Sequence, residues 1–135
     1  MRLKALVWIL RPGPGGRPEV LLLERPQRRG GGEHPVTGKA DPGEQPPACA
    51  GREAQEETGL RGDLVALNLV HRYRAGRGVF EEHAFLLSVA RRAEPTLSSE
   101  HVAFRWAAPD DARAALHWKA HRDALDAALS KWAAP

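Results

Sequence analysis

Two apolar segments open the chain and predict its first pair of strands. Residues 4–10 and 19–24 are rich in branched side chains, which favour extended backbone. The segment between them, residues 11–18, holds three prolines and three glycines, a composition that is typical of a turn. The pattern therefore predicts a β-hairpin at the start of the chain.

The next regular element is a helix, predicted from Pro46 to Thr58. Pro46 and Pro47 fit its first turn, where proline costs no hydrogen bond, and Gly59 fits the position that ends a helix. Because the pattern changes from strand to helix, the chain is expected to form a mixed α/β domain.

The second half of the chain predicts three strands and a final helix. Either Asp110 or Asp111 is expected to cap a short helix. The last helix is amphipathic, with Leu125, Leu129 and Trp132 on one side. The expected ranges are 64–71, 79–90 and 102–107 for the strands and 118–132 for the helix. Nothing repeats and no linker divides the chain, so residues 1–135 are expected to form a single domain.

Three carboxylates share one face of the predicted helix. Glu53, Glu56 and Glu57 stand at positions i, i+3 and i+4, where like charges repel and weaken a helix. A divalent cation would relieve this repulsion, because Mg²⁺ prefers oxygen ligands and also bridges phosphates. A solvated acidic face, partly offset by Arg52, is the alternative interpretation.

The surrounding residues favour the metal site. The segment follows the pattern G-x5-E-x7-R-E-U-x-E-E-x-G-U, in which U is an apolar aliphatic residue. Agreement at all nine positions has a chance of about one in 10⁸ in a single window. The matching residues are Gly38, Glu44, Arg52, Glu53, Ala54, Glu56, Glu57, Gly59 and Leu60.

This pattern resembles the Nudix box. The resemblance implies a Nudix fold, an α/β/α sandwich with a mixed sheet between the box helix and C-terminal helices. It also implies a loop from Gly38 to Gln45, followed by the helix. Mg²⁺ is the implied cofactor, with Mn²⁺ as a substitute. The implied metal ligands are Gly38, through its carbonyl, and Glu53, Glu56, Glu57 and Glu100.

Arg52 and Glu44 lie too far apart in sequence to pair on one straight helix. They can meet only if the loop folds back, and the pair would then brace the site. Cys49 lies outside the glutamate face, and we expect a small buried residue there rather than a nucleophile.

Segments outside the box resemble two Nudix subgroups. Residues 36–38, Val-Thr-Gly, and residues 100–106, Glu-His-Val-Ala-Phe-Arg-Trp, resemble dihydroneopterin triphosphate pyrophosphohydrolases. The second segment also resembles asymmetric diadenosine-tetraphosphate hydrolases. In both subgroups Glu100 would reach the metal site, as a ligand or as the base that deprotonates water. The catalytic candidates are therefore Glu53, Glu100 and Arg52, while His101 is expected to order its loop.

Substrate binding is expected to involve residues outside the box. Arg28 and Arg29 belong to a basic loop, residues 25–33, which is either a mobile connector or a flap that meets phosphates. Lys39 is a candidate phosphate contact and Tyr73, like Phe80, a candidate to stack on a flat ring.

Two further features concern the residues around the site. Alternation places Glu81 and His83 on one face of their strand and Glu82 on the other. One of the three is a candidate to face the site. The resembling families commonly carry an aromatic residue shortly before the box, where this chain has Gly32, Glu33 and His34, which opens the possibility of broader specificity.

Composition adds little to this interpretation. A formal charge of +3 suits an anionic ligand. A single cysteine excludes an intrachain disulfide, which favours a reducing compartment. No apolar run reaches the ~18 residues needed to cross a bilayer. A cytoplasmic enzyme without a membrane or nucleic-acid partner is expected, as a monomer or homodimer.

The predicted function is Mg²⁺-dependent cleavage of a nucleoside-diphosphate-linked substrate. A nucleoside or dihydroneopterin triphosphate would give a monophosphate and pyrophosphate. Hydrolysis of a diadenosine polyphosphate is the alternative enzymatic function. A third hypothesis, a non-catalytic module that senses nucleotides, is disfavoured because every box glutamate is present.

Overall fold

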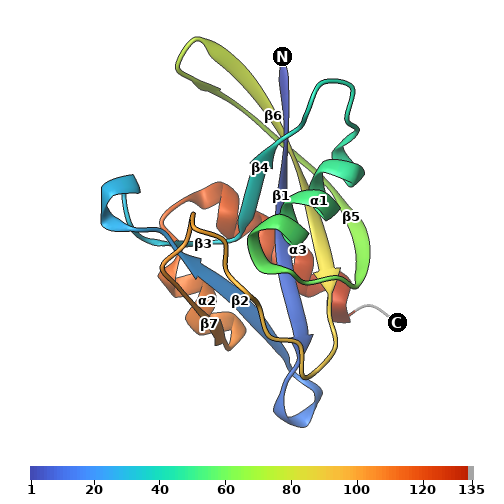
Figure 1. Cartoon of the computed structure of the whole chain (residues 1–135). Helices are drawn as coiled ribbons and strands as arrows, with labels where there is room; N and C mark the ends of the chain where they lie inside the picture. Colours follow the sequence, from blue (N-terminus) through green and yellow to red (C-terminus); the bar gives the residue numbers. More distant parts are fainter. Residues whose placement is uncertain (134–135) are drawn as a thin grey trace.

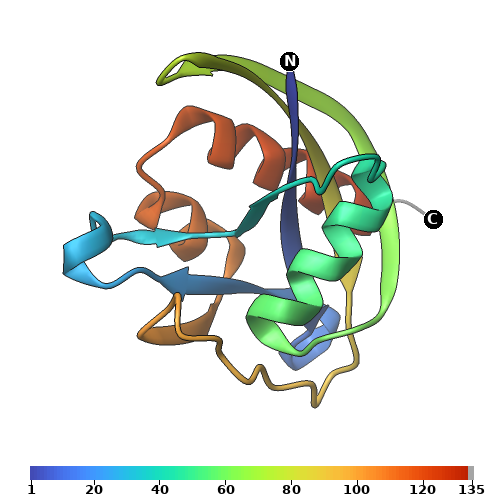
Figure 2. The ribbon, with the colours of Figure 1, turned by 45° about the horizontal axis from the view of Figure 1, so that its top comes forward.

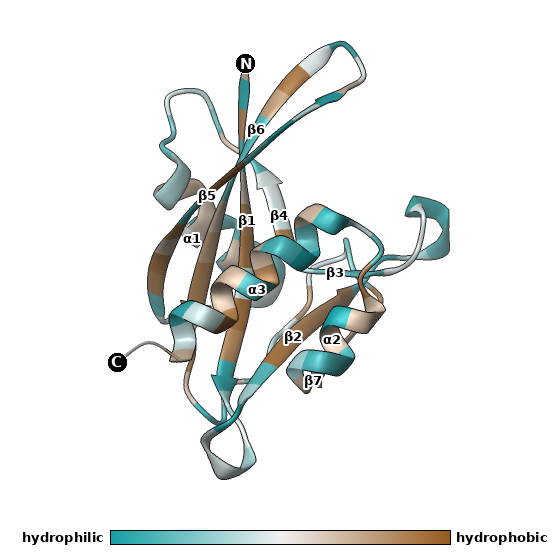
Figure 3. Ribbon diagram, turned by 180° about the vertical axis from the view of Figure 1, so that it is seen from behind, coloured by the Kyte–Doolittle hydropathy of each residue, from teal (hydrophilic) through white to brown (hydrophobic). Residues whose placement is uncertain are grey.

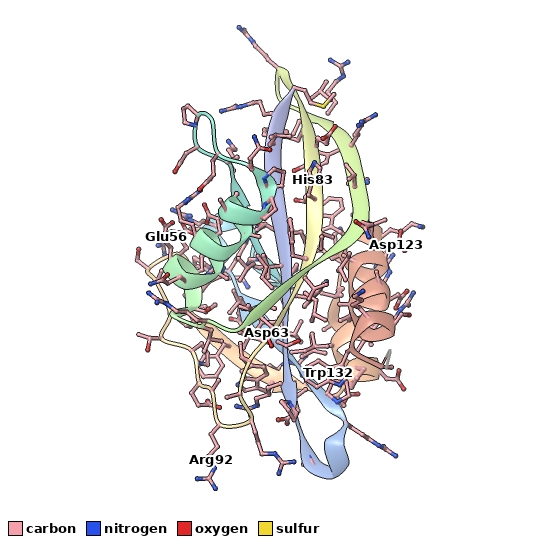
Figure 4. The ribbon with its side chains drawn as sticks, turned by 90° about the vertical axis from the view of Figure 1, so that its right-hand side faces the viewer. Glu56, Asp63, His83, Arg92, Asp123 and Trp132 are labelled. Carbon is pink, nitrogen blue, oxygen red and sulfur yellow. The ribbon has the colours of Figure 1, made fainter. Side chains whose placement is uncertain are left out.

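A mixed β-sheet between two layers of helix forms the core of the protein. The computed structural model describes residues 1–133 of the chain. Helix α1 (Pro46–Thr58) covers one face of the sheet, and helices α2 (Pro109–Ala115) and α3 (Lys119–Ala133) cover the other (Figures 1 and 4). The α/β/α sandwich and mixed sheet predicted from the sequence are therefore confirmed.

Strand β1 (Arg2–Pro12) is the centre of the sheet. It pairs in parallel with β6 along one edge, and its other edge pairs antiparallel with β2 and β4. The β1–β2 pairing confirms the predicted hairpin. The remaining strands are β2 (Pro18–Glu24), β3 (Glu33–His34), β4 (Val36–Lys39), β5 (Asp63–Ala75), β6 (Gly78–Ser88) and β7 (Ala103–Ala107).

Alternation along β1 supplies both faces of the sheet with apolar side chains. Ala5, Val7 and Ile9 pack towards α1, whereas Leu6 and Trp8 pack towards α2 and α3. The Trp8 indole N–H donates to the carbonyl of His121 (3.1 Å), which fixes the start of α3 over the sheet. Burial of both faces explains why this strand is an almost continuous apolar run.

The helices follow the sequence prediction with one error and one small shift. Helix α3 begins and ends one residue later than the expected range 118–132. Helix α1 begins and ends at the predicted residues, and Gly59 closes it in the left-handed conformation (φ 71°). The prediction that Asp110 or Asp111 caps a helix is wrong. The cap of α2 is Ala108, and both aspartates lie in the first turn, where their charge favours the helix dipole.

Strand β4 was not predicted from the sequence. Gly38, expected in a loop, lies within β4 opposite Ala5 of β1. The backbone of Gly38 is therefore held by the sheet rather than by a loop, which fixes its position against α1. Within residues 1–133, no helix has the length and apolarity that spanning a bilayer requires.

Candidate active site

The site is built where β4 approaches the middle of α1. A Cβ atom at Gly38 would overlap the carboxylate of Glu53, so only glycine permits this approach. The approach places the Gly38 backbone directly against an acidic side chain, and the Gly38 carbonyl lies 3.7 Å from Cys49 Sγ, one helical turn before that side chain.

Arg52 neutralises the acidic side chains around it. Its guanidinium donates two hydrogen bonds to Glu44, both 2.8 Å long, so the loop after β4 does fold back to the helix as predicted. Arg52 also donates to Glu53 (3.0 Å) and Glu56 (3.1 Å) and to the carbonyl of Lys39 (3.1 Å). These contacts with Arg52 lower the pKa of Glu44 to about 2.

The three helix glutamates differ in exposure. The side chain of Glu57 is only 4% exposed, that of Glu53 is 15% exposed and that of Glu56 is 57% exposed. Figure 4 shows Glu56 on the outer side of α1. Glu57 and Glu53 thus form the enclosed part of the acidic face, and Glu56 lies at its rim.

A loop from the distant part of the chain docks on the C-terminal end of α1. The backbone N–H of Thr96 donates to the backbone carbonyl of Thr58 (2.9 Å), and that of Ser98 donates to the backbone carbonyl of Glu57 (3.2 Å). These two bonds hold the loop that carries Glu100 and His101 beside the acidic face. No protein hydrogen bond to the Glu100 carboxylate occurs among residues 1–133, and this residue is exposed.

Glu57, Glu100 and His101 form a compact group of potential ligands. One atom from each lies within 4.8 Å of the others. Glu57 Oε2 is buried without a hydrogen-bond partner in the described chain. Burial, together with Glu53 and Glu100, raises the pKa of Glu57 well above its ordinary range. A buried acceptor with no donor, facing other carboxylates, fits a divalent cation, so the residues present suit the metal that the sequence predicted.

Two buried histidines, His34 and His101, contact each other beside this group. His34 Nδ1 lies 2.5 Å from the carbonyl of Pro35, and its Nε2 lies 3.0 Å from His101 Nε2. A carbonyl only accepts, so His34 Nδ1 carries the proton and His34 Nε2 accepts from His101. His101 Nε2 is therefore a donor, 3.8 Å from Glu57 Oε1. This supports the predicted ordering role of His101 rather than a metal-ligand role for that nitrogen.

A cavity of about 260 Å³ opens beside this group. It is lined by Glu57, Glu100 and both histidines, and by Thr37 of β4 and two arginines, Arg25 and Arg29. Arginines next to carboxylates suit a phosphate bridged by a metal. Of the two loop arginines predicted to bind substrate, Arg29 lies at the cavity, whereas Arg28 is exposed and does not line it.

The other predicted substrate residues lie further away. Lys39 lines a separate surface hollow along residues 39–45. Tyr73 stacks between His71 and Phe80 and accepts a hydrogen bond from Lys4 (2.8 Å). The structure thus brings Tyr73 and Phe80 together, but outside the cavity that contains the carboxylates.

Sequence reasoning missed three residues of the cavity. Arg25 was included only as part of a basic loop, and His34 and Thr37 only as the entry to the box. Their positions depend on the pairing of β2, β3 and β4, for which the sequence gives no local pattern. Cys49 is buried as predicted, and burial raises its pKa to about 11, so it is a thiol and not a nucleophile.

Comparison with protein families gives one match that spans nearly the whole chain. The NUDIX domain model matches residues 1–128. An octanoyltransferase from Myxococcus xanthus is 40% identical over 98 residues, which is 70% of this chain. The chain spans only 28% of the length of that relative.

Solved structures share the fold at low sequence identity. A Caenorhabditis elegans Ap4A hydrolase superposes with a TM-score of 0.85 at 23% identity, and 98% of each chain is covered. The Escherichia coli dihydroneopterin triphosphate pyrophosphohydrolase superposes with a TM-score of 0.81 at 21% identity, covering 96% of this chain and 95% of the other. Both likenesses support the fold.

The Glu44–Arg52 pair predicts a specific dependence of stability on pH. The folded pKa of Glu44, about 2, is below its ordinary value of 4.5. The pair therefore stabilises the fold above pH 4.5, and this stabilisation is lost as the pH falls towards about 2. Glu44→Gln should remove this part of the decline in Tm, measured by circular dichroism across that range. The exposed Glu24→Gln should decline as the wild type does, and identical profiles for all three proteins would contradict the pair's role.

Proposed function

The chain belongs to the NUDIX family of hydrolases that act on phosphoric anhydride bonds, and we propose that it cleaves a nucleoside or dihydroneopterin triphosphate to a monophosphate and pyrophosphate with Mg²⁺. One observation carries the proposal: Glu57 Oε2, a buried carboxylate oxygen with no donor among residues 1–133, belongs to a residue that lines a cavity together with two arginines. Such a site combines a place for a cation with a place for a polyphosphate.

Five residues of the chain would hold the metal ion. The Gly38 backbone lies against Glu53, one oxygen of Glu57 lies within 4.8 Å of one of Glu100, and Glu56 lies at the rim for an outer ion or its water. When bound, the ion neutralises the diphosphate and lowers the pKa of a water molecule. Mn²⁺ accepts the same oxygen ligands and is expected to substitute.

Glu100 is the better candidate for the general base. Glu53 is fixed by Arg52 (3.0 Å) and by the close approach of Gly38, whereas Glu100 has no hydrogen bond to its carboxylate within residues 1–133. A carboxylate free of such bonds can take a proton from the attacking water. The water oxygen then bonds to phosphorus, the P–O bond of the anhydride breaks, and pyrophosphate leaves with the electron pair.

Arg25 and Arg29 would hold the phosphate chain, and Arg52 would act through others. Both cavity arginines can pair with phosphate oxygens in a bidentate manner. Arg52 already spends its donors on Glu44, Glu53 and Glu56. It therefore positions the carboxylates rather than touching the substrate.

A substrate screen tests this function directly. Purified protein with Mg²⁺ is offered nucleoside triphosphates, dihydroneopterin triphosphate, diadenosine tetraphosphate, ADP-ribose and nucleotide sugars, with and without added pyrophosphatase. We expect phosphate release from triphosphates only when pyrophosphatase is present, and none with EDTA. Formation of ATP and AMP from the tetraphosphate would favour the diadenosine alternative. Binding of nucleotide without turnover of any compound would favour the sensing module.

Glu57→Gln should abolish turnover without loss of the fold. The amide keeps the volume of the side chain but removes the charge that a cation needs. We expect a loss greater than the roughly 10- to 100-fold that follows removal of an outer-shell partner. Because burial disfavours the charged form of Glu57, its Tm in EDTA should equal or exceed that of the wild type. Near-wild-type activity would remove Glu57 from the metal site.

Glu100→Gln should lower the rate while metal binding largely persists. Loss of a general base costs about 10²- to 10⁴-fold in kcat. Calorimetric titration with Mg²⁺ and Mn²⁺ measures the retained affinity, and steady-state kinetics measures kcat. An unchanged kcat would mean that Glu100 is only a loop residue.

A further inference from the structure

A single side-chain contact fastens the loop that carries Glu100 to the sheet. Residues 95–102, here called the Glu100 loop, pass the C-terminal end of α1 on the way from β6 to β7 (Figure 2). Within residues 1–133, the only hydrogen bond between a side chain of this loop and a residue outside it joins His101 Nε2 to His34 Nε2 (3.0 Å). The imidazole of His34 is therefore the side-chain anchor of the loop.

His34 is a polar ring in apolar surroundings. It lies in β3 opposite Leu23 of β2 and is only 4% exposed. Figure 3 shows the hydrophobic ribbon of β2 beside β3. Burial in these surroundings, together with the charge of Arg25, lowers the pKa of His34 to about 3. The ring is therefore neutral at physiological pH, with one donor nitrogen and one acceptor nitrogen.

The contacts of His34 assign the proton on each ring. Its Nδ1 faces the carbonyl of Pro35, which only accepts, so the proton is on Nδ1 and Nε2 is an acceptor. His101 then donates through its Nε2. In the other neutral form of His101, two acceptor nitrogens would face each other at 3.0 Å, and an N–H group at Nδ1 would be buried with no partner in the described chain. The hydrogen bonds therefore run in one direction, from His101 through His34 to Pro35.

The N–H group that His34 accepts also lies near Glu57. His101 Nε2 is 3.8 Å from Glu57 Oε1, which is beyond hydrogen-bond distance. The nitrogen carries one hydrogen and gives it to His34, so Glu57 receives no hydrogen bond from this ring. A carboxylate is a stronger acceptor than a neutral imidazole. If the acceptor at His34 were lost, a small movement of the ring would turn the same N–H group to Glu57.

We propose that His34 is a positioning residue of the metal site, which holds the N–H group of His101 away from Glu57 and so leaves that carboxylate for the cation. The same hydrogen bond keeps Glu100 beside Glu57, because Glu100 directly precedes His101 in the loop. This inference rests on the proposed function, since it concerns the carboxylates that would hold Mg²⁺.

Nuclear magnetic resonance of the ¹⁵N-labelled, metal-free protein tests the hydrogen bond directly. A scalar coupling between the two Nε2 nuclei is transmitted only across an N–H···N bond, and couplings within each ring identify the protonated nitrogen. We expect this coupling, with the proton on Nε2 of His101 and on Nδ1 of His34. Absence of the coupling, or a proton on Nε2 of His34, would overturn the proposal.

Two variants of similar size separate the acceptor of His34 from its volume. His34→Gln keeps an acceptor oxygen that can reach His101, whereas His34→Leu has no acceptor. Loss of a partner that orients a metal site typically weakens metal binding by about 10- to 100-fold. We expect this loss of Mn²⁺ affinity in His34→Leu and nearly wild-type affinity in His34→Gln, measured from the electron paramagnetic resonance signal of free Mn²⁺.

His117→Leu is the control for the loss of a histidine. This residue is exposed between α2 and α3 and does not line the cavity, so its replacement should leave the Mn²⁺ affinity unchanged. Melting curves in EDTA show whether each variant folds. Equal affinities in all four proteins, or an equal loss in the leucine and glutamine variants of His34, would contradict the positioning role. If His34→Leu does not fold, the coupling in the wild type and the affinity of His34→Gln decide.

The outcomes separate this inference from the proposed function. None of these measurements requires turnover. A wild type that binds Mn²⁺ but hydrolyses no triphosphate would overturn the proposed function alone, and the His34 variants would still decide the positioning role. Absence of Mn²⁺ binding in the wild type would overturn both.

Discussion

The rest of this structure depends on one constraint, the concentration of several carboxylates at the end of α1. Glu53, Glu57 and Glu100 converge although like charges repel. Arg52 offsets part of this repulsion by holding Glu44, Glu53 and Glu56 at once. Among the described residues Arg52 donates no hydrogen bond to Glu57, and this imbalance is what a divalent ion at the site would offset.

The surrounding fold keeps the carboxylates from moving apart. The Gly38 backbone lies in a sheet, so Glu53 has no room to move towards it. On the other side, Thr96 and Ser98 tie the Glu100 loop to the last turn of α1. The cost of assembling like charges is met by two apolar cores, one on each face of the sheet, which stabilise the domain independently of the site.

The part of the site that local sequence determines could be predicted. The box spacing fixes the face of α1 and the pairing of Glu44 with Arg52, and proline and glycine mark the ends of the helix. Capping of α2 was predicted wrongly because Ala108 occupies the cap and Pro109 starts the helix. The two aspartates are therefore the second and third residues of the helix. Single-residue boundaries depend on backbone geometry that composition does not encode.

The part that long-range pairing determines could not be predicted. Arg25 and His34 reach the cavity because β2 pairs with β3, and the neighbours of Glu82 follow from the parallel pairing of β1 with β6. Alternation correctly separated Glu82 from Glu81 and His83, yet it could not show which face carried the aromatic rings. A period of two gives relative orientation within a strand, whereas the identity of each face depends on distant strands.

The replacement of an aromatic residue before the box bears on how a ring is bound. Glu33 stands in that region and accepts two hydrogen bonds from Arg105 of β7, at 2.6 and 2.8 Å. A bidentate ion pair fixes two strands to each other and offers no aromatic surface for a ring. The rings of Tyr73 and Phe80 provide such a surface on the opposite face, next to β1. These rings lie outside the cavity that contains Glu57 and Glu100, so the phosphate site is built without them, and substitutions at Tyr73 or Phe80 leave the candidate metal ligands in place.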